Sequence, residues 1–197
     1  MRAMSDTDPI ARFSEWLEEA RAERSIPEPT AMTLATATKD GAPSARIVLL
    51  KAHDGNGFVF YTNLESRKGE ELAANPRAAL CFYWAPLLRQ VRIEGGVTPV
   101  SDAEADAYFT TRDRNKQAGA WASKQSRPLA SRPQLVTGVS KVEADYDEKS
   151  IPRPPFWSGW RLKPEHIEFW QEGEFRLHQR DLYTRDGSGW KHTLLYP

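Results

Sequence analysis

The chain has 197 residues, and its 27 Lys and Arg balance its 27 Asp and Glu, so the formal net charge at pH 7 is zero. This balance argues against a general nucleic-acid-binding protein, which is usually basic overall. The single cysteine, Cys81, excludes a disulfide framework and a thiolate metal cluster, and no apolar run approaches the roughly 18 residues of a membrane span.

The N-terminal region predicts one amphipathic helix. Asp8-Pro9 has the pattern of an N-cap followed by proline at the first helical position. Apolar residues recur at helical spacing through residues 10–20, so we expect a helix to about Arg24. The N-terminus lacks the apolar core of a signal peptide, and we therefore expect a cytoplasmic protein.

Residues 31–100 have the pattern of a strand-rich region with one helix. Asp-Gly-Asn-Gly at 54–57 is a strong turn signal, and Ile-Val-Leu-Leu within 44–53 indicates a strand buried on both faces. The segment 85–87 would connect two antiparallel strands. The expected elements are strands at 31–38, 44–53 and 58–62, a helix at 66–75, and strands at 78–84 and 89–100.

The remaining chain begins helical and ends in strands. Capping boxes at 101–104 and 131–134 mark two helix starts, and the three prolines within 149–155 indicate a linker. The expected elements are helices at 101–111, 115–123 and 131–146, and strands at 157–163, 166–171, 175–185 and 190–195, with a hairpin turn at 186–189.

Strands outnumber helices, and short turns join many of them. This favours a mainly β protein, with an antiparallel sheet closed into a small barrel and helices packed outside. We expect one domain overall, with an N-terminal helix and lead-in at 1–30, a barrel core with helices at 31–148, and C-terminal strands at 149–197 that complete the barrel.

Several common chemical motifs are absent from the sequence. There is no GxxxxGK[ST] phosphate loop, GxGxxG fingerprint, HExxH or GxSxG. The four histidines are scattered, so we expect no metal site. Cys81 falls in an apolar strand and is interpreted as an inert core residue.

The start of the 66–75 helix predicts an anion site. Ser66 is a candidate N-cap, and Arg67 and Lys68 then fall in the first turn, where each opposes the helix dipole by about 0.3–1 kcal/mol. A phosphate bound at the helix start would explain this arrangement. The alternative is that both basic side chains are simply exposed to solvent, at little cost in free energy.

Other polar residues lie within apolar strands. Arg46 and Lys51 flank an apolar run and are five residues apart, so on a regular strand their side chains would point to opposite faces. They would then face two different ligands, or they would simply mark the two ends of a buried strand. Gln90, in a predicted interior strand, needs a hydrogen-bond partner. Residues 124–127, Lys-Gln-Ser-Arg, form a polar basic loop.

Near the C-terminus, Arg176, His178 and Arg180 alternate with other residues. On a strand they would share one face, where three potential cations would repel one another unless something anionic or electron-rich lay against them. The alternative is a solvated basic edge strand that discourages edge-to-edge pairing.

Taken in order, these segments closely resemble the pyridoxine/pyridoxamine 5′-phosphate oxidase family, over roughly residues 8–190. The motifs that carry the resemblance are RIVLLK (46–51), FYTN (60–63), SRK (66–68), RQV (89–91), GAWASKQS (119–126), PPFWSGWR (154–161), IEFWQ (167–171) and RLHQR (176–180).

The resemblance implies an FMN-binding split β-barrel that works as a homodimer, with the flavin at the subunit interface. By motif, the residues that would contact FMN are Arg46, Ile47, Val48, Leu49, Leu50, Lys51, Tyr61, Thr62, Arg67, Lys68, Gln90, Gln125, Ser126, Trp170 and Arg180.

The resemblance also implies an oxidase that converts pyridoxine or pyridoxamine 5′-phosphate to pyridoxal 5′-phosphate. The substrate C4′ carbon would give a hydride to the flavin, and O2 would reoxidise the flavin to yield H2O2. Arg176 and His178 would be catalytic, lying against the substrate ring. The substrate-binding set would be Lys51, Tyr108, Arg112, Lys116, Arg176, Leu177 and His178.

Some positions depart from the family pattern. Lys116 stands where a serine is usual near the substrate phosphate, Gln179 replaces the aspartate of RLHDR, and the chain ends in Leu-Leu-Tyr-Pro rather than Arg-Leu-x-Pro. The alternative is therefore a protein of the same fold that binds FMN or a B6 phosphate, with another substrate or little turnover. We expect neither nucleic acid nor membrane as a partner.

Overall fold

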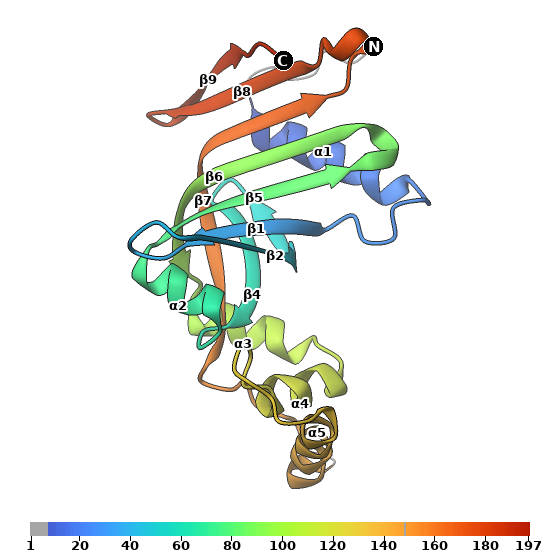
Figure 1. The fold of residues 1–197 in the computed structure, drawn as a ribbon, viewed down its shortest axis with the longest axis vertical. Helices are drawn as coiled ribbons and strands as arrows, with labels where there is room; N and C mark the ends of the chain where they lie inside the picture. The colour runs from blue at the N-terminus through green and yellow to red at the C-terminus, as the bar shows by residue number, and fades with distance from the viewer. Residues whose placement is uncertain (1–7, 148) are drawn as a thin grey trace.

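The computed structural model describes residues 8–147 and 149–197 (Figure 1). Residues 1–7, at the start of the expected N-terminal segment, and residue 148, at an expected boundary, lie outside the described residues. The helices are α1 (Pro9–Ala22), α2 (Arg67–Ala74), α3 (Asp102–Thr110), α4 (Arg114–Ala122) and α5 (Arg132–Tyr146), with 3-10 turns η1 (Ala85–Leu87) and η2 (Glu174–Arg176). The strands are β1 (Ala31–Ala37), β2 (Pro43–Leu49), β3 (Ala52–Asp54), β4 (Gly57–Asn63), β5 (Arg77–Trp84), β6 (Arg89–Pro99), β7 (Trp157–Gln171), β8 (Gln179–Asp186) and β9 (Gly189–Leu194).

These strands form one antiparallel sheet. Its order is β2-β1-β5-β6-β7-β4-β3, and β8 and β9 extend from β7. The sheet curls into a half-barrel, with α1 across it and α2 to α5 gathered toward one end (Figure 1). The expected mainly β, antiparallel split barrel with flanking helices is confirmed. No helix among the described residues is long and apolar enough to cross a membrane.

Strand β7 holds the two ends of the sheet together. We expected two strands at 157–163 and 166–171, but the structure has one continuous strand paired with β6 along most of its length. Its first half also pairs with β4 and its second half with β8. At the change of partner, the β6 register shifts between Glu94 and Gly95, and this bulge accommodates Pro164 within the strand.

Helix α1 covers the core of the sheet. Phe13 and Leu17 are completely buried, and the Phe13 ring contacts Phe58 and Phe82 edge to face at centroid distances of 5.0 and 5.1 Å. Trp16 packs in the same way on Phe169 of β7, at 5.1 Å. Burying such aromatic side chains contributes strongly to folding, and α1 is therefore part of the hydrophobic core of the half-barrel.

The helix starts agree with the sequence patterns. The capping side chain accepts a backbone N–H in each of four helices. The four capping residues are Asp8, Ser66, Ser101 and Ser131.

Two expected strands are wrong in part. The 44–53 strand divides into β2 and β3, and β2 is an exposed edge of the sheet rather than buried on both faces; the side chain of Ile47 is 64% exposed. The 175–185 strand begins only at Gln179, because Phe175 and Arg176 adopt left-handed backbone conformations (φ 56° and 64°) that no strand accommodates.

Candidate functional site

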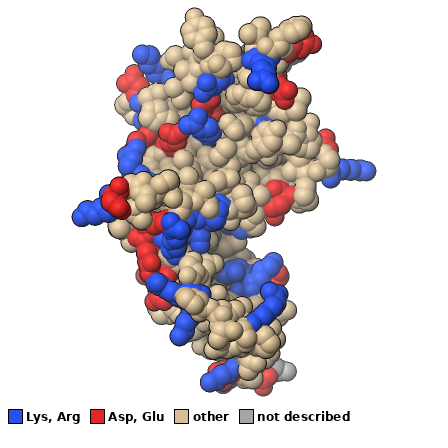
Figure 2. Space-filling model, in the orientation of Figure 1, with Lys and Arg blue, Asp and Glu red and all other residues tan. Residues whose placement is uncertain are grey.

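A cavity of about 820 Å³ lies among β2, β4, α2, α3, α4 and the loop after α4. This volume is typical of small-molecule sites. Figure 2 shows Lys and Arg side chains on both sides of the hollow. The cavity lining includes fourteen of the residues that the resemblance assigned: Arg46, Ile47, Val48, Leu49, Lys51, Tyr61, Thr62, Arg67, Lys68, Tyr108, Arg112, Lys116, Gln125 and Ser126.

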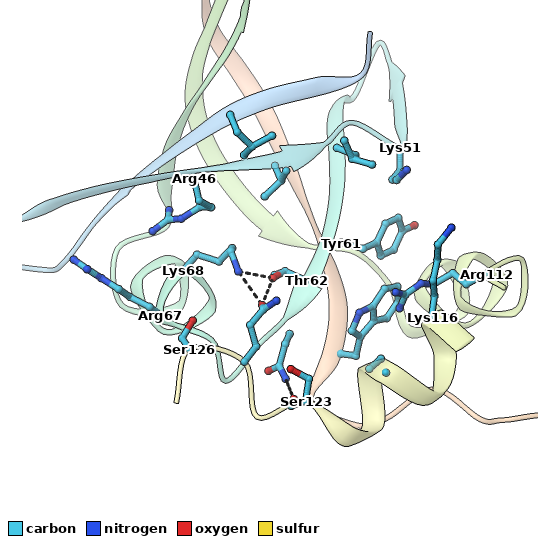
Figure 3. Close-up of a pocket in the computed structure, with 18 of the residues that line it drawn as sticks. Arg46, Lys51, Tyr61, Thr62, Arg67, Lys68, Arg112, Lys116, Ser123 and Ser126 are labelled. Atoms are coloured by element: carbon cyan, nitrogen blue, oxygen red, sulfur yellow. Dashed lines mark hydrogen bonds between the residues drawn. The ribbon is translucent and has the colours of Figure 1, made fainter. Parts of the chain in front are cut away.

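Three basic side chains, the first cation group, stand at the start of α2: Arg46, Arg67 and Lys68 (Figure 3). Ser66 caps this helix, and its Oγ accepts from the Lys68 ammonium at 3.2 Å. The structure therefore confirms that basic side chains gather at the start of this helix. An anion fits here because the helix dipole and the side chains both favour negative charge.

Lys68 is buried rather than solvated. Its Nζ donates to Thr62 Oγ1 at 3.1 Å and to Gln125 Oε1 at 2.8 Å. Burial, followed by the charge of Arg46, lowers the pKa of Lys68 to about 8, although Glu71 acts in the opposite sense. A buried ammonium that retains its charge near neutral pH is well suited to bind an anion.

Glu71, on the next turn of α2, is a buried carboxylate within the first cation group. Thr36 and Ser44 donate their hydroxyls to Oε2 at 2.5 Å each, and Arg67 Nε donates to Oε1 at 2.8 Å. Burial alone would raise the pKa of Glu71, but these hydrogen bonds, with the charge of Arg46, lower it to about 2. Glu71 is therefore ionised at neutral pH.

The loop after α4 closes this end of the cavity. Asn63 donates to Ser123 O at 3.3 Å, and Arg127 donates to Glu65 O at 3.3 Å, so the loop is tied to the segment before α2. Ser126 adopts a left-handed conformation (φ 69°), which turns the chain within the cavity wall.

A second cation group lies at the other end of the cavity: Lys51, Arg112 and Lys116 (Figure 3). The Arg112 guanidinium stacks 4.7 Å over the Trp157 ring, and its Nη1 is buried with no hydrogen-bond partner among the described residues. Lys116 pairs with Asp113 at 2.6 Å. The orphaned nitrogen indicates that a ligand acceptor belongs beside Arg112.

Aromatic rings support the second cation group. Tyr61 stacks on Tyr108 at a centroid distance of 4.0 Å and on Trp157 at 5.3 Å. Gly159, opposite Tyr61 on β7, permits this, since a Cβ there would lie 2.8 Å from the Tyr61 ring. Burial, with a smaller effect of the Glu104 charge, raises the pKa of Tyr61 to about 12, so its phenol stays protonated.

Arg46 and Lys51 line one cavity, although strand alternation predicted opposite faces. The alternation fails because β2 ends at Leu49 and the chain turns before β3. Within that turn, Leu50 is only 4% exposed and belongs to the core, so its side chain does not line the cavity.

Three assigned residues form a separate row. Gln90, Trp170 and Arg180 are direct cross-strand neighbours on β6, β7 and β8 and do not line this cavity. Arg180 Nε donates to Glu168 at 2.8 Å, which neutralises its charge. The strands β8 and β9 lie at the opposite end of the molecule from α3 and α4 (Figure 1).

Arg176, Leu177 and His178 precede β8 and also lie outside the cavity. The prediction that Arg176 and His178 share a strand face with Arg180 is wrong, because η2 and the residues after it are not extended strand. His178 instead packs on Trp170 at a centroid distance of 4.7 Å, and Leu177 is 71% exposed.

Two of the residues that sequence reasoning missed are Glu71, which contacts the first cation group, and Trp157, which lines the cavity. Glu71 follows Arg67 by four positions, the spacing of a helical ion pair, and this pattern could have indicated it. Trp157 falls within the PPFWSGWR motif, but the sequence alone has no signal that it would carry Arg112.

Two family models match the chain. One, described as pyridoxamine 5′-phosphate oxidase, matches residues 17–171. The other, described as the C-terminal dimerisation region of pyridoxine 5′-phosphate oxidase, matches residues 157–197. Curated relatives from several bacteria bear the name pyridoxine/pyridoxamine 5′-phosphate oxidase. The Rhodospirillum rubrum protein is 56% identical with 100% of both chains covered, and the Myxococcus xanthus protein is 56% identical with 100% of this chain and 95% of the relative covered.

Two solved structures are also similar. PhzG from Burkholderia lata, in complex with tetrahydrophenazine-1-carboxylic acid, has a TM-score of 0.91 at 37% identity, covering 96% of this chain and 93% of PhzG. A pyridoxamine 5′-phosphate oxidase-related, FMN-binding protein from Nostoc punctiforme has a TM-score of 0.76 at 18% identity, covering 96% and 98%, and shares the fold.

Proposed function

The chain belongs to the pyridoxine/pyridoxamine 5′-phosphate oxidase family, and on that premise we propose that it oxidises pyridoxine or pyridoxamine 5′-phosphate to pyridoxal 5′-phosphate, consuming O2 and releasing H2O2. The protein is a flavin-dependent oxidoreductase, and its cofactor is FMN. The observation that carries the substrate proposal is the pair of cation groups at opposite ends of one cavity (Figure 3). One anion site would serve a flavin carrier, whereas two suit a phosphorylated cofactor and a phosphorylated substrate.

The first cation group fits the flavin phosphate. Arg67 and Lys68 present charge at the start of α2, and Gln125 and Ser126 close the cradle from the loop. Ile47 to Leu49 form an apolar wall on β2, along which a flat ring system could lie. When bound, FMN supplies the group that accepts a hydride from the substrate.

The second cation group fits the substrate phosphate. Lys51 and Lys116 supply point charges, and the Arg112 fork has an unpartnered nitrogen. Tyr108, stacked on Tyr61, completes this end. These residues would bind and orient the substrate, so that its reacting carbon lies toward the apolar wall.

Arg176 and His178 would act from a second copy of the chain. The match of residues 157–197 to a dimerisation region supports a homodimer. In such a dimer, the row Gln90, Trp170 and Arg180 and the segment of Arg176 and His178 would complete the cavity of the partner. This arrangement would explain why one chain gathers only part of the assigned set.

A second candidate is an FMN-dependent oxidation of another anionic substrate. The similarity to PhzG, whose structure holds a carboxylic acid, favours this alternative. A carboxylate would also suit Arg112, but the three cations of the second group exceed the charge of a single carboxylate.

Oxygen consumption by FMN-loaded protein tests the proposal. We expect turnover with both phosphorylated vitamers, detectable H2O2, and little turnover with the unphosphorylated vitamers, because the second cation group would be left without an anion. Activity with a cyclic carboxylic acid and none with either phosphate would instead establish the second candidate.

A further inference from the structure

Glu71 is an anion directly behind the proposed phosphate site: it contacts Arg46 and Arg67, which line the cavity, but does not line the cavity itself. Its side chain is 5% exposed, and it belongs to α2, the helix whose start presents Arg67 and Lys68. A fixed negative charge at this place repels a phosphate. Its retention within the cradle therefore calls for a function beyond simple attraction of the ligand.

The contacts of Arg67 suggest what Glu71 does. Arg67 is 61% exposed, and a long exposed side chain samples many rotamers. Glu71 binds it only through Nε, at 2.8 Å. The terminal nitrogens, which carry the fork geometry that matches phosphate, have no hydrogen-bond partner among the described residues, and Arg67 is one of the residues that line the cavity.

Glu71 also holds Arg46, but mainly indirectly, through the hydroxyl groups of two other residues. Thr36 and Ser44 donate their protons to Glu71, so their oxygen lone pairs face Arg46, which donates to Thr36 at 2.5 Å and also to Ser44. Arg46 Nη2 itself lies 3.5 Å from Glu71. The carboxylate therefore sets the direction of the hydroxyls that hold the second arginine.

We propose that Glu71 is a positioning residue for FMN: its carboxylate holds Arg67 and Arg46 in the conformations that bind the flavin phosphate. This inference rests on the proposed placement of that phosphate at the first cation group. Fixing the two arginines before binding reduces the entropy lost when the phosphate arrives. Three cations and one carboxylate also leave a net charge of +2, which balances a phosphate dianion.

The substitution Glu71→Gln tests the positioning role, because it keeps the shape of the side chain and changes only its hydrogen bonding and charge. Three donors converge on Oε2 and one on Oε1, so the amide oxygen of glutamine would face the three. Its NH2 would then face the Nε–H of Arg67, and two donors cannot bond to each other. Arg67 would be released while the fold of α2 is kept.

The readout is the affinity of the apoprotein for FMN and for riboflavin, measured by flavin fluorescence. For Glu71→Gln, we expect the preference for FMN to fall about tenfold, the size of one charge-assisted hydrogen bond, with riboflavin affinity unchanged within about twofold. In an Arg67→Ala background, Glu71→Gln should change the preference by less than about twofold, because the residue it acts through is gone.

Glu165→Gln is the matched control, because Glu165 pairs with Arg77 on the surface outside this cavity. It should leave both affinities unchanged. Glu71→Asp keeps the charge but is too short to reach both arginines, and it should also lose FMN preference if Glu71→Gln does not fold.

Several results would overturn the inference. An unchanged or stronger FMN preference would make Glu71 a charge that merely opposes the phosphate. An equal loss of affinity for FMN and for riboflavin would assign Glu71 a purely structural role. If Glu71→Gln lowered the FMN preference just as much in the Arg67→Ala background, Glu71 would not act through Arg67. A wild-type protein without FMN preference would instead refute the proposed phosphate site itself.

Discussion

Lys68 is the residue at the site whose charge responds to pH near neutrality. Burial, then the Arg46 charge, lowers its pKa to about 8, so its positive charge is present below pH 8 and is lost as the pH rises through that value. FMN affinity should therefore decline above pH 8, whereas riboflavin affinity should not, since riboflavin has no phosphate to pair with Lys68.

Fluorescence titrations of the apoprotein across this pH range provide the measurement. Lys68→Met, which cannot titrate, should bind FMN weakly and without this pH dependence. If riboflavin affinity declined in parallel with FMN affinity, the decline would belong to the fold rather than to Lys68.

Lys116 is the clearest departure from the family pattern at the substrate end. Two helices were expected at 101–111 and 115–123, and α3 indeed ends at Thr110 and α4 begins at Arg114. Although no single helix carries them, Tyr108, Arg112 and Lys116 all line the cavity. The Lys116 ammonium forms an ion pair with the Asp113 carboxylate at 2.6 Å, and both side chains are exposed.

We expect Lys116→Ser to raise KM for the phosphorylated substrate by a few-fold and to leave kcat unchanged, the signature of lost uniform binding. Asp113→Asn should lower KM, because it frees the Lys116 ammonium. Steady-state kinetics decide between this role and obstruction: activity that appears only in Lys116→Ser would show that the lysine blocks the site.

At the scale of elements, local signals predicted the helices well and the strands less well. The four side-chain caps depend on sequence neighbours, so patterns such as Ser66 before Arg67 were sufficient. The end of β2 and the late start of β8 depend on partners elsewhere in the chain. The apolar residues 47–49 indicated a strand buried on both faces, but they belong to β2, which is an edge strand of the sheet and borders the cavity.

The motifs predicted the site more completely than strand periodicity did. They supplied eleven of the assigned residues that line one cavity, although the sequence positions span 46–126, and the family resemblance added Tyr108, Arg112 and Lys116. Periodicity placed Arg176, His178 and Arg180 on one face, and the left-handed conformations of Phe175 and Arg176 show why it failed. The i,i+4 spacing could indicate the Arg67–Glu71 pair, but no local pattern contains the contacts of Glu71 with Thr36 on β1 and Ser44 on β2.

The β-bulge opposite Glu94 and Gly95 of β6 inserts one extra residue, Glu165, into β7, which joins both ends of the sheet. A Cβ at Gly95 would lie 2.0 Å from Lys163 O, whereas one at Gly96 would meet nothing nearer than 3.8 Å. Gly95→Ala should therefore destabilise the protein by about 2–4 kcal/mol, while Gly96→Ala stays within about 1 kcal/mol. Equal unfolding midpoints of the two variants in urea would show that the backbone can shift at no cost.

For the whole molecule, the central consequence of the proposed function is that one chain would carry two half-sites. The cavity holds both cation groups, while Trp170, Arg180, Arg176 and His178 lie outside it. Exposed apolar side chains near the second half-site, including Phe175 (89% exposed), are consistent with a surface that a second copy covers.

Subunit complementation tests this arrangement. Arg67→Glu damages the cavity, and Arg180→Glu damages the C-terminal half-site, so each homodimer should bind FMN weakly. After the two are mixed and exchange subunits, about a quarter of the sites should be intact, since each mixed dimer carries one undamaged site. Equilibrium dialysis against FMN measures the recovery; mixing without any recovery would place both half-sites in one subunit.

Anaerobic mixing of the FMN-loaded protein with pyridoxine 5′-phosphate tests the central claim most directly. Without O2, electrons that leave the substrate remain on the flavin, so one turnover is visible in the absorbance spectrum. We expect the yellow oxidised-flavin absorbance to be lost with the phosphorylated vitamer, to persist with unphosphorylated pyridoxine, and to return when air is admitted. A flavin that stays oxidised with both pyridoxine and pyridoxamine 5′-phosphate would contradict the proposed oxidase function.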